Sequence, residues 1–283
     1  MSGPGPGSPA TTSRPDDRNA LMRRLDAGEV ALGLSVRLAG APGIASIAAD
    51  CGFDWLFIDL EHGPMAFDTA AATALAALAA GITPVVRVAG HEAFHANRAL
   101  TNGALGLIFP HVDDAAQALA CSRSARFAPQ GSRGVPAVFP QLGWRKPPLA
   151  EATARLNALT SVIVMIESAA AVQAAEAIAA VPGVDALFVG ASDLSVEMGH
   201  PGDYRAPAVR EALSHVADAA ARHGCHAGLG GVGDAGLLGE LVREGYRLLL
   251  AGNDLDLFMS AARERTRQWH ALAGPGGGPG GHA

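Results

Sequence analysis

Eight short runs of apolar and β-branched residues recur along the chain, and each is followed by a segment with helical periodicity. The predicted strands are Ala31–Val36, Trp55–Asp59, Pro84–Val88, Gly106–Pro110, Ser161–Glu167, Ala186–Gly190, His226–Gly230 and Tyr246–Ala251. The predicted helices cover residues 42–50, 66–80, 92–101, 113–126, 169–180, 207–223, 233–244 and 254–271, with an additional helix at Asn19–Ala27. Eight strand–helix units in about 250 residues are what a closed (β/α)₈ barrel requires. We therefore expect an α/β protein of the TIM-barrel type with an extra N-terminal helix.

A doubly wound open sheet is the alternative arrangement of such units. Its usual glycine-rich nucleotide turn is missing, because no G-x-G-x-x-G motif follows the first predicted strand and no Walker lysine motif occurs. The barrel is therefore the favoured fold.

Composition narrows the class of protein. The chain is 49% hydrophobic with only 5% aromatic residues, which suits helices packed on a parallel sheet. The net charge of −6 and the absence of a long basic run argue against a nucleic-acid partner. No apolar stretch approaches the roughly 20 residues of a membrane span. The three cysteines lack metal-ligand spacing and predict reduced thiols in a cytoplasmic protein.

Domain boundaries follow from glycine and proline content. Residues 1–18 and 274–283 are rich in both and are expected to be disordered tails, which leaves 19–273 as a single barrel domain. A long, proline-rich connection follows the fourth strand, from Arg126 to Thr160, with a predicted helix at Leu149–Leu159. Such a loop is expected at one end of the barrel, shaping either a substrate mouth or a subunit contact.

Titratable side chains gather where the predicted strands end. These residues are Arg37, Asp59, Glu61, His62, Arg87, His111, Glu167 and Asp193. The carboxyl ends of barrel strands converge on one face, where active sites are built. We therefore expect these side chains to form one site, although the acids and histidine of I-D-L-E-H-G-P (58–64) could also simply cap the next helix.

Two of these acids have the pattern of a metal site. Glu167 ends the apolar run V-I-V-M-I-E, and a carboxylate buried there needs a partner or a metal. Together with Asp193 it offers hard oxygen ligands suited to Mg²⁺ or Mn²⁺. The alternative is an acid pair bridged by arginine, or Asp193 as a helix N-cap.

Arg87, His62 and Asp59 are the candidate catalytic residues. Arg87 could stabilise charge on a substrate oxygen, or simply pair with a neighbouring acid. His62 with Asp59 three positions earlier predicts a carboxylate-oriented imidazole that transfers protons. Both can face the site only if the strand ends near residue 60 and turns, because neighbouring strand positions alternate.

Five separated motifs carry a resemblance to a known family. They are I-D-L-E-H-G-P (58–64), P-V-V-R (84–87), P-x-G-x-R-G (129–134), M-I-E-S (165–168) and F-V-G-A-S-D-L-S-V-E-M-G (188–199). In order and spacing they are similar to those of the HpcH/HpaI family of class II, metal-dependent 2-oxo-acid aldolases. The resemblance covers roughly residues 20–265.

The resemblance implies a metal-dependent aldolase or lyase that makes or breaks a C–C bond through a metal-bound enolate of pyruvate or a related 2-oxo acid, with an aldehyde partner. It implies a divalent ion, Mg²⁺ or Mn²⁺ with Co²⁺ as a third candidate, on Glu167 and Asp193. It also implies a homo-oligomer, a hexamer or a trimer.

The resemblance also implies roles for further residues. Arg87 would stabilise the enolate oxygen, and His62 with Asp59 would move the proton at the aldehyde oxygen. The backbone N–H groups of Gly190, Ala191 and Ser192 would hold the substrate carboxylate.

The chain departs from the family pattern in several places. Met165 stands where a glutamine is common, the turn at 190–193 lacks a proline, and Thr101 replaces an acid. Arg37 and His111 are unusual for simple pyruvate aldolases, and His111 is similar to a feature of macrophomate synthase, a more distant relative. Both are candidate acceptor-binding residues, and Arg37 would favour an anionic acceptor.

Other functions remain open at this point. The first alternative is an oxaloacetate decarboxylase or a macrophomate-synthase-like enzyme that forms C–C bonds. An acyl-CoA lyase is less favoured, because the sequence has no obvious basic cradle for a nucleotide. A non-catalytic barrel used for binding or assembly is also less favoured, because every proposed active-site residue is present.

Overall fold

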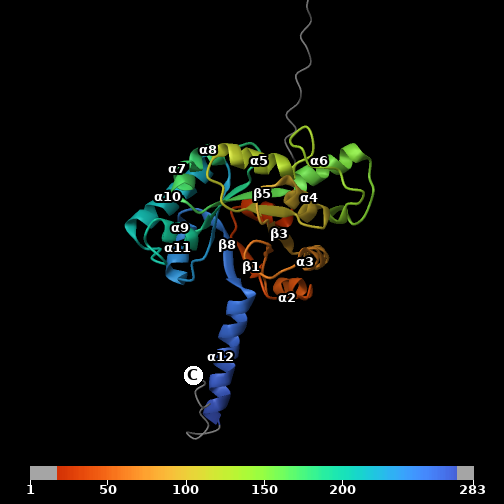
Figure 1. The fold of residues 1–283 in the computed structure, drawn as a ribbon. Helices are drawn as coiled ribbons and strands as arrows, with labels where there is room; N and C mark the ends of the chain where they lie inside the picture. The colour runs from red at the N-terminus through yellow and green to blue at the C-terminus, as the bar shows by residue number, and fades with distance from the viewer. Residues whose placement is uncertain (1–17, 273–283) are drawn as a thin grey trace, which may run out of the picture.

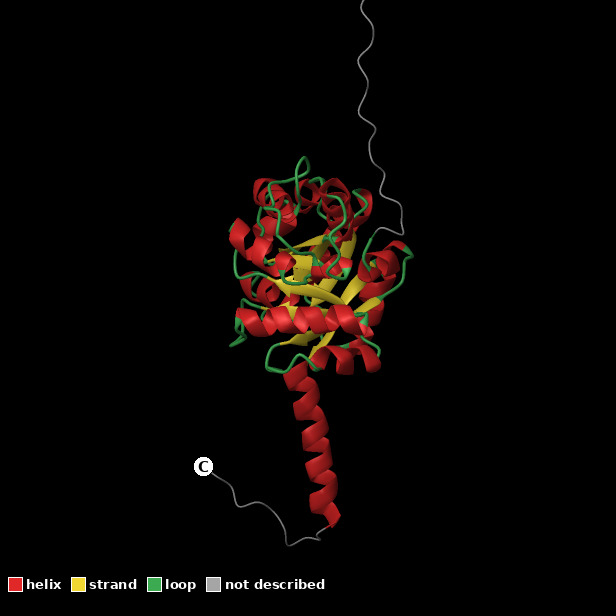
Figure 2. Cartoon of the chain, turned by 90° about the vertical axis from the view of Figure 1, so that its right-hand side faces the viewer, coloured by secondary structure: helices red, strands yellow, loops and turns green. Residues whose placement is uncertain are grey.

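The structure, a computed structural model that describes residues 18–272, is a closed barrel of eight parallel strands surrounded by helices (Figures 1 and 2). The strands pair in chain order, and β8 closes the barrel against β1. They are β1 (Ala31–Val36), β2 (Trp55–Asp59), β3 (Thr83–Arg87), β4 (Gly106–Phe109), β5 (Ser161–Ile166), β6 (Ala186–Gly190), β7 (His226–Gly230) and β8 (Tyr246–Asn253). The (β/α)₈ prediction is confirmed.

The helices also lie close to their predicted positions. They are α1 (Ala20–Asp26), α2 (Ile44–Asp50), α3 (Phe67–Ala80), α4 (Ala93–Thr101), α5 (Ala115–Ala125), α6 (Leu149–Leu159), α7 (Ala169–Gln173), α8 (Ala175–Ala179), α9 (Ala191–Glu197), α10 (Pro207–Arg222), α11 (Ala235–Arg243) and α12 (Asp254–Leu272). Local signals set several starts, because the side chains of Asn19, Asp114 and Asp234 each accept a backbone N–H of the first turn. The predicted helix 169–180 is interrupted at Ala174, and α9 is an additional short helix.

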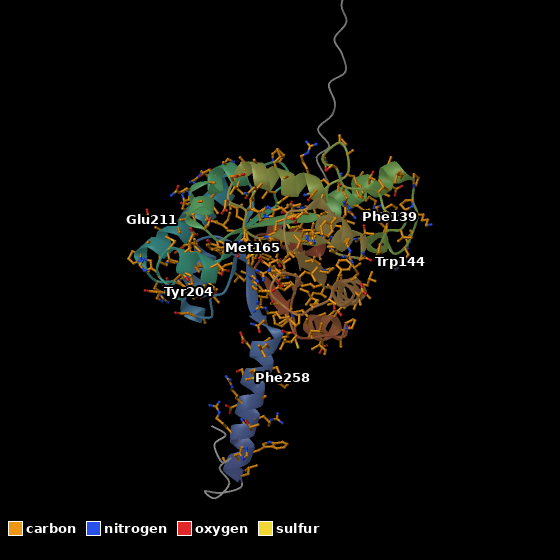
Figure 3. The ribbon with its side chains drawn as sticks, in the orientation of Figure 1. Phe139, Trp144, Met165, Tyr204, Glu211 and Phe258 are labelled. Carbon is orange, nitrogen blue, oxygen red and sulfur yellow. The ribbon has the colours of Figure 1, made fainter. Side chains whose placement is uncertain are left out.

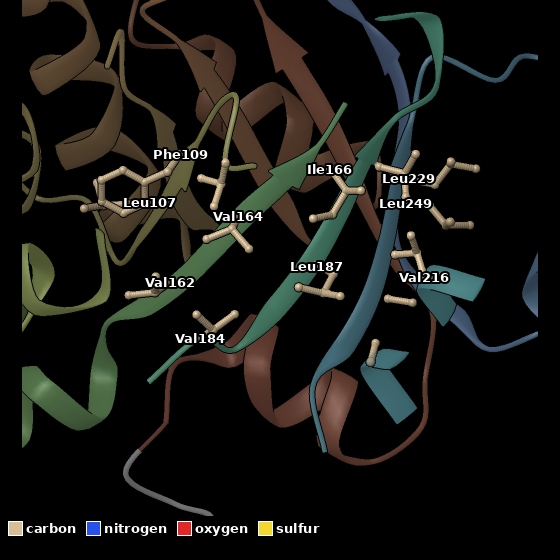
Figure 4. Close-up of a cluster of buried hydrophobic side chains, with 14 of the residues drawn as sticks. Leu107, Phe109, Val162, Val164, Ile166, Val184, Leu187, Val216, Leu229 and Leu249 are labelled. Atoms are coloured by element: carbon tan, nitrogen blue, oxygen red, sulfur yellow. The ribbon is translucent and has the colours of Figure 1, made fainter. Parts of the chain in front are cut away.

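Strand alternation divides the apolar side chains into two layers. Residues such as Leu107, Val164 and Leu187 face the helices and form the larger core (Figure 4). The alternate positions, among them Trp55, Phe57 and Phe188, fill the barrel interior. Leu21, Met22 and Leu25 of α1 pack against this interior cluster. The N-terminal helix therefore plugs the barrel end from which the strands begin, and the other end is left for a site.

The segment between α5 and α6 does not shape that site. The side chain of Gln141, in the short 3₁₀-helix η2 (Pro140–Leu142), donates to the carbonyls of Leu100 and Ala104 near the start of β4. None of residues 126–160 lines the pocket at the other barrel end. Figure 3 shows Phe139 and Trp144 on this segment, far from Met165 in the barrel. The substrate-mouth interpretation is wrong, and the subunit-contact alternative stays a prediction.

The last helix leaves the barrel. α12 begins directly after β8 and has no buried residue, and both views show it projecting from the body of the molecule (Figures 1 and 2). The sequence pattern predicted an eighth helix at the right place. The pattern could not show that only the first turns of this helix contact its own barrel.

The predicted tails, 1–18 and 274–283, fall outside the described residues except for Arg18. That residue is tied to the barrel by ion pairs with Asp26 and Asp185. None of the helices in residues 18–272 combines the length and apolar character that a membrane crossing requires.

Candidate active site

A cavity of about 460 Å³ opens at the carboxyl ends of the strands. This size is ordinary for a small-molecule site. Its lining brings together most of the residues predicted from the strand ends, namely Arg37, Asp59, His62, Arg87, Gly190, Ala191, Ser192 and Asp193, together with Met165. Glu61 and Glu167 are not in that lining, nor is His111, which contacts both acids.

The floor of the cavity is an ion pair between Asp59 and Arg87. The two residues are register partners on β2 and β3, and both point into the barrel. Nε of Arg87 donates to Oδ1 of Asp59 at 2.9 Å, and Nη2 donates to Oδ2 at 2.6 Å. The guanidinium carbon also lies 5.1 Å from the Phe57 ring centre. This bidentate geometry fixes the plane of the guanidinium and leaves Nη1 for other partners.

Asp59 is held in its ionised form. Its side chain is only 1% exposed, and burial alone would raise its pKa. The hydrogen bond and charge of Arg87, with the backbone N–H groups of His62 and Glu61, outweigh burial and lower the pKa below its ordinary value. The carboxylate therefore stays charged and keeps Arg87 in place.

His62 is not oriented by Asp59. β2 ends at Asp59 as expected, and the chain then turns, but the Asp59 carboxylate accepts the backbone N–H of His62 rather than the imidazole. The imidazole is 52% exposed, and its Nε2 lies 3.8 Å from Oε2 of Glu61. The predicted Asp59–His62 side-chain pair is therefore not formed. The ring stands at the cavity mouth, and its nearest acid is Glu61.

Glu61 is the acid for which the sequence suggested no role beyond contacts to metal-bound water. Its Oε2 lies 3.0 Å from Nη1 of Arg87, and its Oε1 lies 2.9 Å from Nε2 of His111. Oε2 is buried and, among the described residues, meets no donor at a hydrogen-bonding angle. The signal in the sequence was its place two residues after Asp59 at the end of a strand.

Glu167 follows β5 directly and is buried beside His111. The backbone N–H of His111 donates to its Oε2 at 3.0 Å, in a loop where His111 itself has a positive φ of 52°. Burial raises the pKa of Glu167, and the negative charges of Asp193 and Glu61 raise it further. The hydrogen bond and charge of His111 lower it, but by less. A Cβ at Gly190 would lie 2.6 Å from Oε1, so glycine is needed there for the carboxylate to approach β6.

Asp193 lies on the first turn of α9. The N-cap of that helix is Gly190, so the alternative that Asp193 is an N-cap is wrong. Asp193 and Glu167 are close enough for their charges to interact. The pairing of both acids with an arginine, the other alternative, is not seen within residues 18–272, where no salt bridge of either acid involves an arginine.

The acids fit a hard divalent cation. Asp193 and Glu61 both place negative charge beside the buried Glu167 carboxylate, and a cation there would offset that repulsion. Within the described part of the chain, no three His, Cys, Asp or Glu side chains are close enough to hold an ion unaided. Two carboxylates completed by water and substrate oxygens are a common arrangement for Mg²⁺.

Arg37 is the outer cation of the cavity. It follows β1, its side chain is 39% exposed, and its Nε lies 3.5 Å from Oδ2 of Asp59. Of the three departures from the family pattern, Met165 lies in the cavity, with Sδ 3.9 Å from Nη1 of Arg87. Ala191 lies in the lining as well, whereas Thr101 closes α4 and does not reach it.

Comparisons with known proteins agree on one family. Residues 37–261 match the family described as HpcH/HpaI aldolase/citrate lyase. A 4-hydroxy-4-methyl-2-oxoglutarate aldolase of Chaetomium globosum is 38% identical, over 86% of this chain and 92% of its own. A hydroxypyruvate/pyruvate aldolase of Chromohalobacter salexigens is 36% identical, over 80% of this chain and 88% of its own.

Solved structures agree on the fold. The crystal structure of an HpcH/HpaI aldolase from Desulfitobacterium hafniense has a TM-score of 0.85 and 30% identity, covering 92% of this chain and 99% of its own. Macrophomate synthase, the distant relative expected from the sequence, has the same fold with a TM-score of 0.78 at 24% identity, covering 92% of this chain and 90% of its own.

Proposed function

The chain belongs to the HpcH/HpaI aldolase/citrate lyase family and is a carbon–carbon lyase, and from this premise we propose that it cleaves and forms 4-hydroxy-2-oxo acids. The donor is pyruvate or a related 2-oxo acid, and the acceptor is an aldehyde or a ketone. The observation that carries this proposal is Arg87, fixed by Asp59 in a cavity that Asp193 also lines.

We assign a divalent metal ion, Mg²⁺ or Mn²⁺, to Glu167 and Asp193, with Co²⁺ as a third candidate. Such an ion acts as a Lewis acid on the 2-oxo group. The negative charges of Asp193 and Glu61 beside the buried Glu167 carboxylate support this assignment. Glu61 would accept hydrogen bonds from water at the site.

The reacting bond is the one between C3 and C4 of the 4-hydroxy-2-oxo acid. In cleavage, His62 takes the proton of the C4 hydroxyl, C4 becomes a carbonyl, and the bonding electron pair passes to the donor fragment as an enolate. Arg87 stabilises the negative charge that develops on the enolate oxygen. Phe57, Met165 and Phe188 give the cavity apolar lining.

The two ends of the substrate meet different groups. The backbone N–H groups of Gly190, Ala191 and Ser192 would hold the carboxylate of the donor, since they line the cavity beside Asp193. Arg37 and His111 would contact the acceptor. The relatives named for 4-hydroxy-4-methyl-2-oxoglutarate act on a compound with a second carboxylate, and the exposed Arg37 guanidinium suits such an acceptor.

One assay tests the proposal directly. Pyruvate in D₂O should lose its C3 protons in the presence of enzyme and Mg²⁺, as measured by proton NMR, and an added aldehyde should be condensed. Following CO₂ release from oxaloacetate in parallel separates aldol from decarboxylative chemistry. Decarboxylation without any exchange or condensation would contradict the aldolase assignment.

We also propose that the protein is a homo-oligomer and that α12 packs on a second copy. This 19-residue helix has no buried residue and exposes Leu255, Leu257, Phe258, Trp269 and Leu272. In proteins most of the stability of a helix comes from packing its apolar face against other structure. A trimer or a hexamer would provide that cover.

The remaining sequence-based assignments belong to the same proposal. Residues 19–273 form one catalytic domain, and the protein works in the cytoplasm. The free thiols of Cys51, Cys121 and Cys225 support a reducing compartment.

A further inference from the structure

The loop after β1, which carries Arg37, is tied to the start of α12 by one carboxylate. Asp254 accepts hydrogen bonds from three consecutive backbone N–H groups, those of Arg37, Leu38 and Ala39. The distances to Oδ2 are 3.2, 2.9 and 2.8 Å. Successive N–H groups that converge on one anion form a concave binding site for it, and the charge strengthens each bond.

This contact lies just beyond the point where the backbone pairing of β1 with β8 ends. Ser35 of β1 pairs with Asn253 of β8, and Asp254 is the next residue along the chain. The carboxylate therefore takes over where backbone pairing between the two strands ends. Oδ1 also accepts the N–H of Leu255, so the same side chain fixes the first turn of α12.

The tie matters because Arg37 has little else to hold it. Its side chain is 39% exposed, and its ion pair with Asp59 is long, at 3.5 Å. Asp59 already accepts two shorter hydrogen bonds from Arg87. The direction of the Arg37 guanidinium is thus set mainly by its backbone, and that backbone is set by Asp254.

We propose that Asp254 is a positioning residue for the acceptor: by holding the loop of residues 37–39, it aims Arg37 at an acceptor that carries a carboxylate. The proposal rests on the aldolase function above and deepens it. The acceptor class it names is a 2-oxo acid or another carbonyl compound with an adjacent carboxylate, as opposed to an uncharged aldehyde.

Two acceptors of similar size provide the test. Glyoxylate carries a carboxylate, whereas glycolaldehyde carries a hydroxymethyl group in its place. Asp254→Ala should raise the KM for glyoxylate roughly tenfold, because the loss of charge-assisted bonds frees Arg37, and should change the KM for glycolaldehyde less than about twofold. Asp254→Asn keeps an oxygen that can accept hydrogen bonds, so its KM for glyoxylate should lie between those of wild type and Asp254→Ala.

The loop itself gives a readout independent of turnover. In hydrogen–deuterium exchange with mass spectrometry, a peptide containing residues 37–39 should exchange faster in Asp254→Ala than in wild type. Asp234→Ala is the matched control, because Asp234 caps α11 on the same barrel face through the N–H of Leu237. That variant should leave both the glyoxylate preference and the exchange of the 37–39 peptide unchanged.

The outcomes distinguish failure of the positioning role of Asp254 from failure of the proposed aldolase function. An unchanged KM for glyoxylate in Asp254→Ala, or an equal loss for both aldehydes, overturns the positioning role. If Arg37→Ala lowers glyoxylate preference while Asp254→Ala does not, Arg37 binds the acceptor without help from Asp254. If wild type shows no exchange of the pyruvate C3 protons, the aldolase function itself is contradicted, and the positioning role that rests on it falls with it.

Discussion

Arg87 is the central residue of the proposed site, and two neighbouring acids contact different nitrogens of its guanidinium. Asp59 binds Nε and Nη2, while Glu61 lies against Nη1. The sequence placed Arg87, Asp59 and His62 together, because strand ends of a barrel converge. It could not tell which donor the Asp59 carboxylate would choose, since that depends on the register of β2 with β3.

Removing the charge of Asp59 should destabilise the fold. Asp59→Asn leaves the buried guanidinium of Arg87 with only Glu61 as a charged partner, and breaking a buried pair in this way costs about 3 kcal/mol of unfolding free energy. Urea unfolding followed by circular dichroism measures the change. Asp218→Asn, on the exposed face of α10, should change it by less than about 0.5 kcal/mol.

The same pair predicts how stability depends on pH. The pKa of Asp59 is lower in the folded protein than its ordinary value of about 3.9 in an unfolded chain. Its stabilising contribution is therefore complete above about pH 4 and is lost as the pH falls through the lower, folded pKa. The stability gap between wild type and Asp59→Asn should be constant between about pH 5 and pH 8 and should shrink below about pH 4. A gap that grew in acid would contradict the assigned shift.

Arg87 should be needed for turnover and not only for structure. Arg87→Lys keeps a positive charge but loses the planar, bidentate contact with Asp59, so kcat should fall by roughly 10²-fold. Steady-state kinetics of pyruvate release, with folding checked by circular dichroism, measure this. A variant with the kcat of wild type would reduce Arg87 to a structural ion pair.

At the scale of elements, hydrophobic periodicity was sufficient to find all eight strands and most helices. Their ends shifted by one or two residues, because hydrogen bonding beyond the apolar run decides where pairing stops. The position of α12 was predicted, but its detachment was not. An amphipathic pattern shows that one face must be covered, and it does not show which molecule covers it.

The exposed apolar side chains of α12 lead to a prediction about the oligomeric state. Light scattering after size-exclusion chromatography should give wild type a mass that is a multiple of 28.7 kDa. Phe258→Asp, which places a charge at an exposed aromatic side chain of the helix (Figure 3), should lower that mass. Gln268→Asp, on the same exposed helix, should leave it unchanged. A monomeric wild type would contradict the role given to α12.

At the scale of the whole molecule, the barrel separates stability from chemistry. α1 and the interior cluster close one end, and the titratable residues collect at the other. The family motifs located the candidate catalytic residues, whereas contacts such as that of Asp254 with the loop after β1 link segments that are more than 200 residues apart. Contacts of that kind follow from the closure of β8 on β1 and have no local signature in the sequence.

The central claim is that a divalent ion, Arg87 and His62 together break the C3–C4 bond of a 4-hydroxy-2-oxo acid. The most direct measurement is the rate of pyruvate release from 4-hydroxy-4-methyl-2-oxoglutarate by enzyme stripped with EDTA, before and after Mg²⁺, Mn²⁺ or Co²⁺ is added. We predict no release from the stripped enzyme, recovery with at least one of these ions, and no recovery in Glu167→Ala or Asp193→Ala. Release at the full rate in EDTA would contradict the metal assignment and the mechanism built on it.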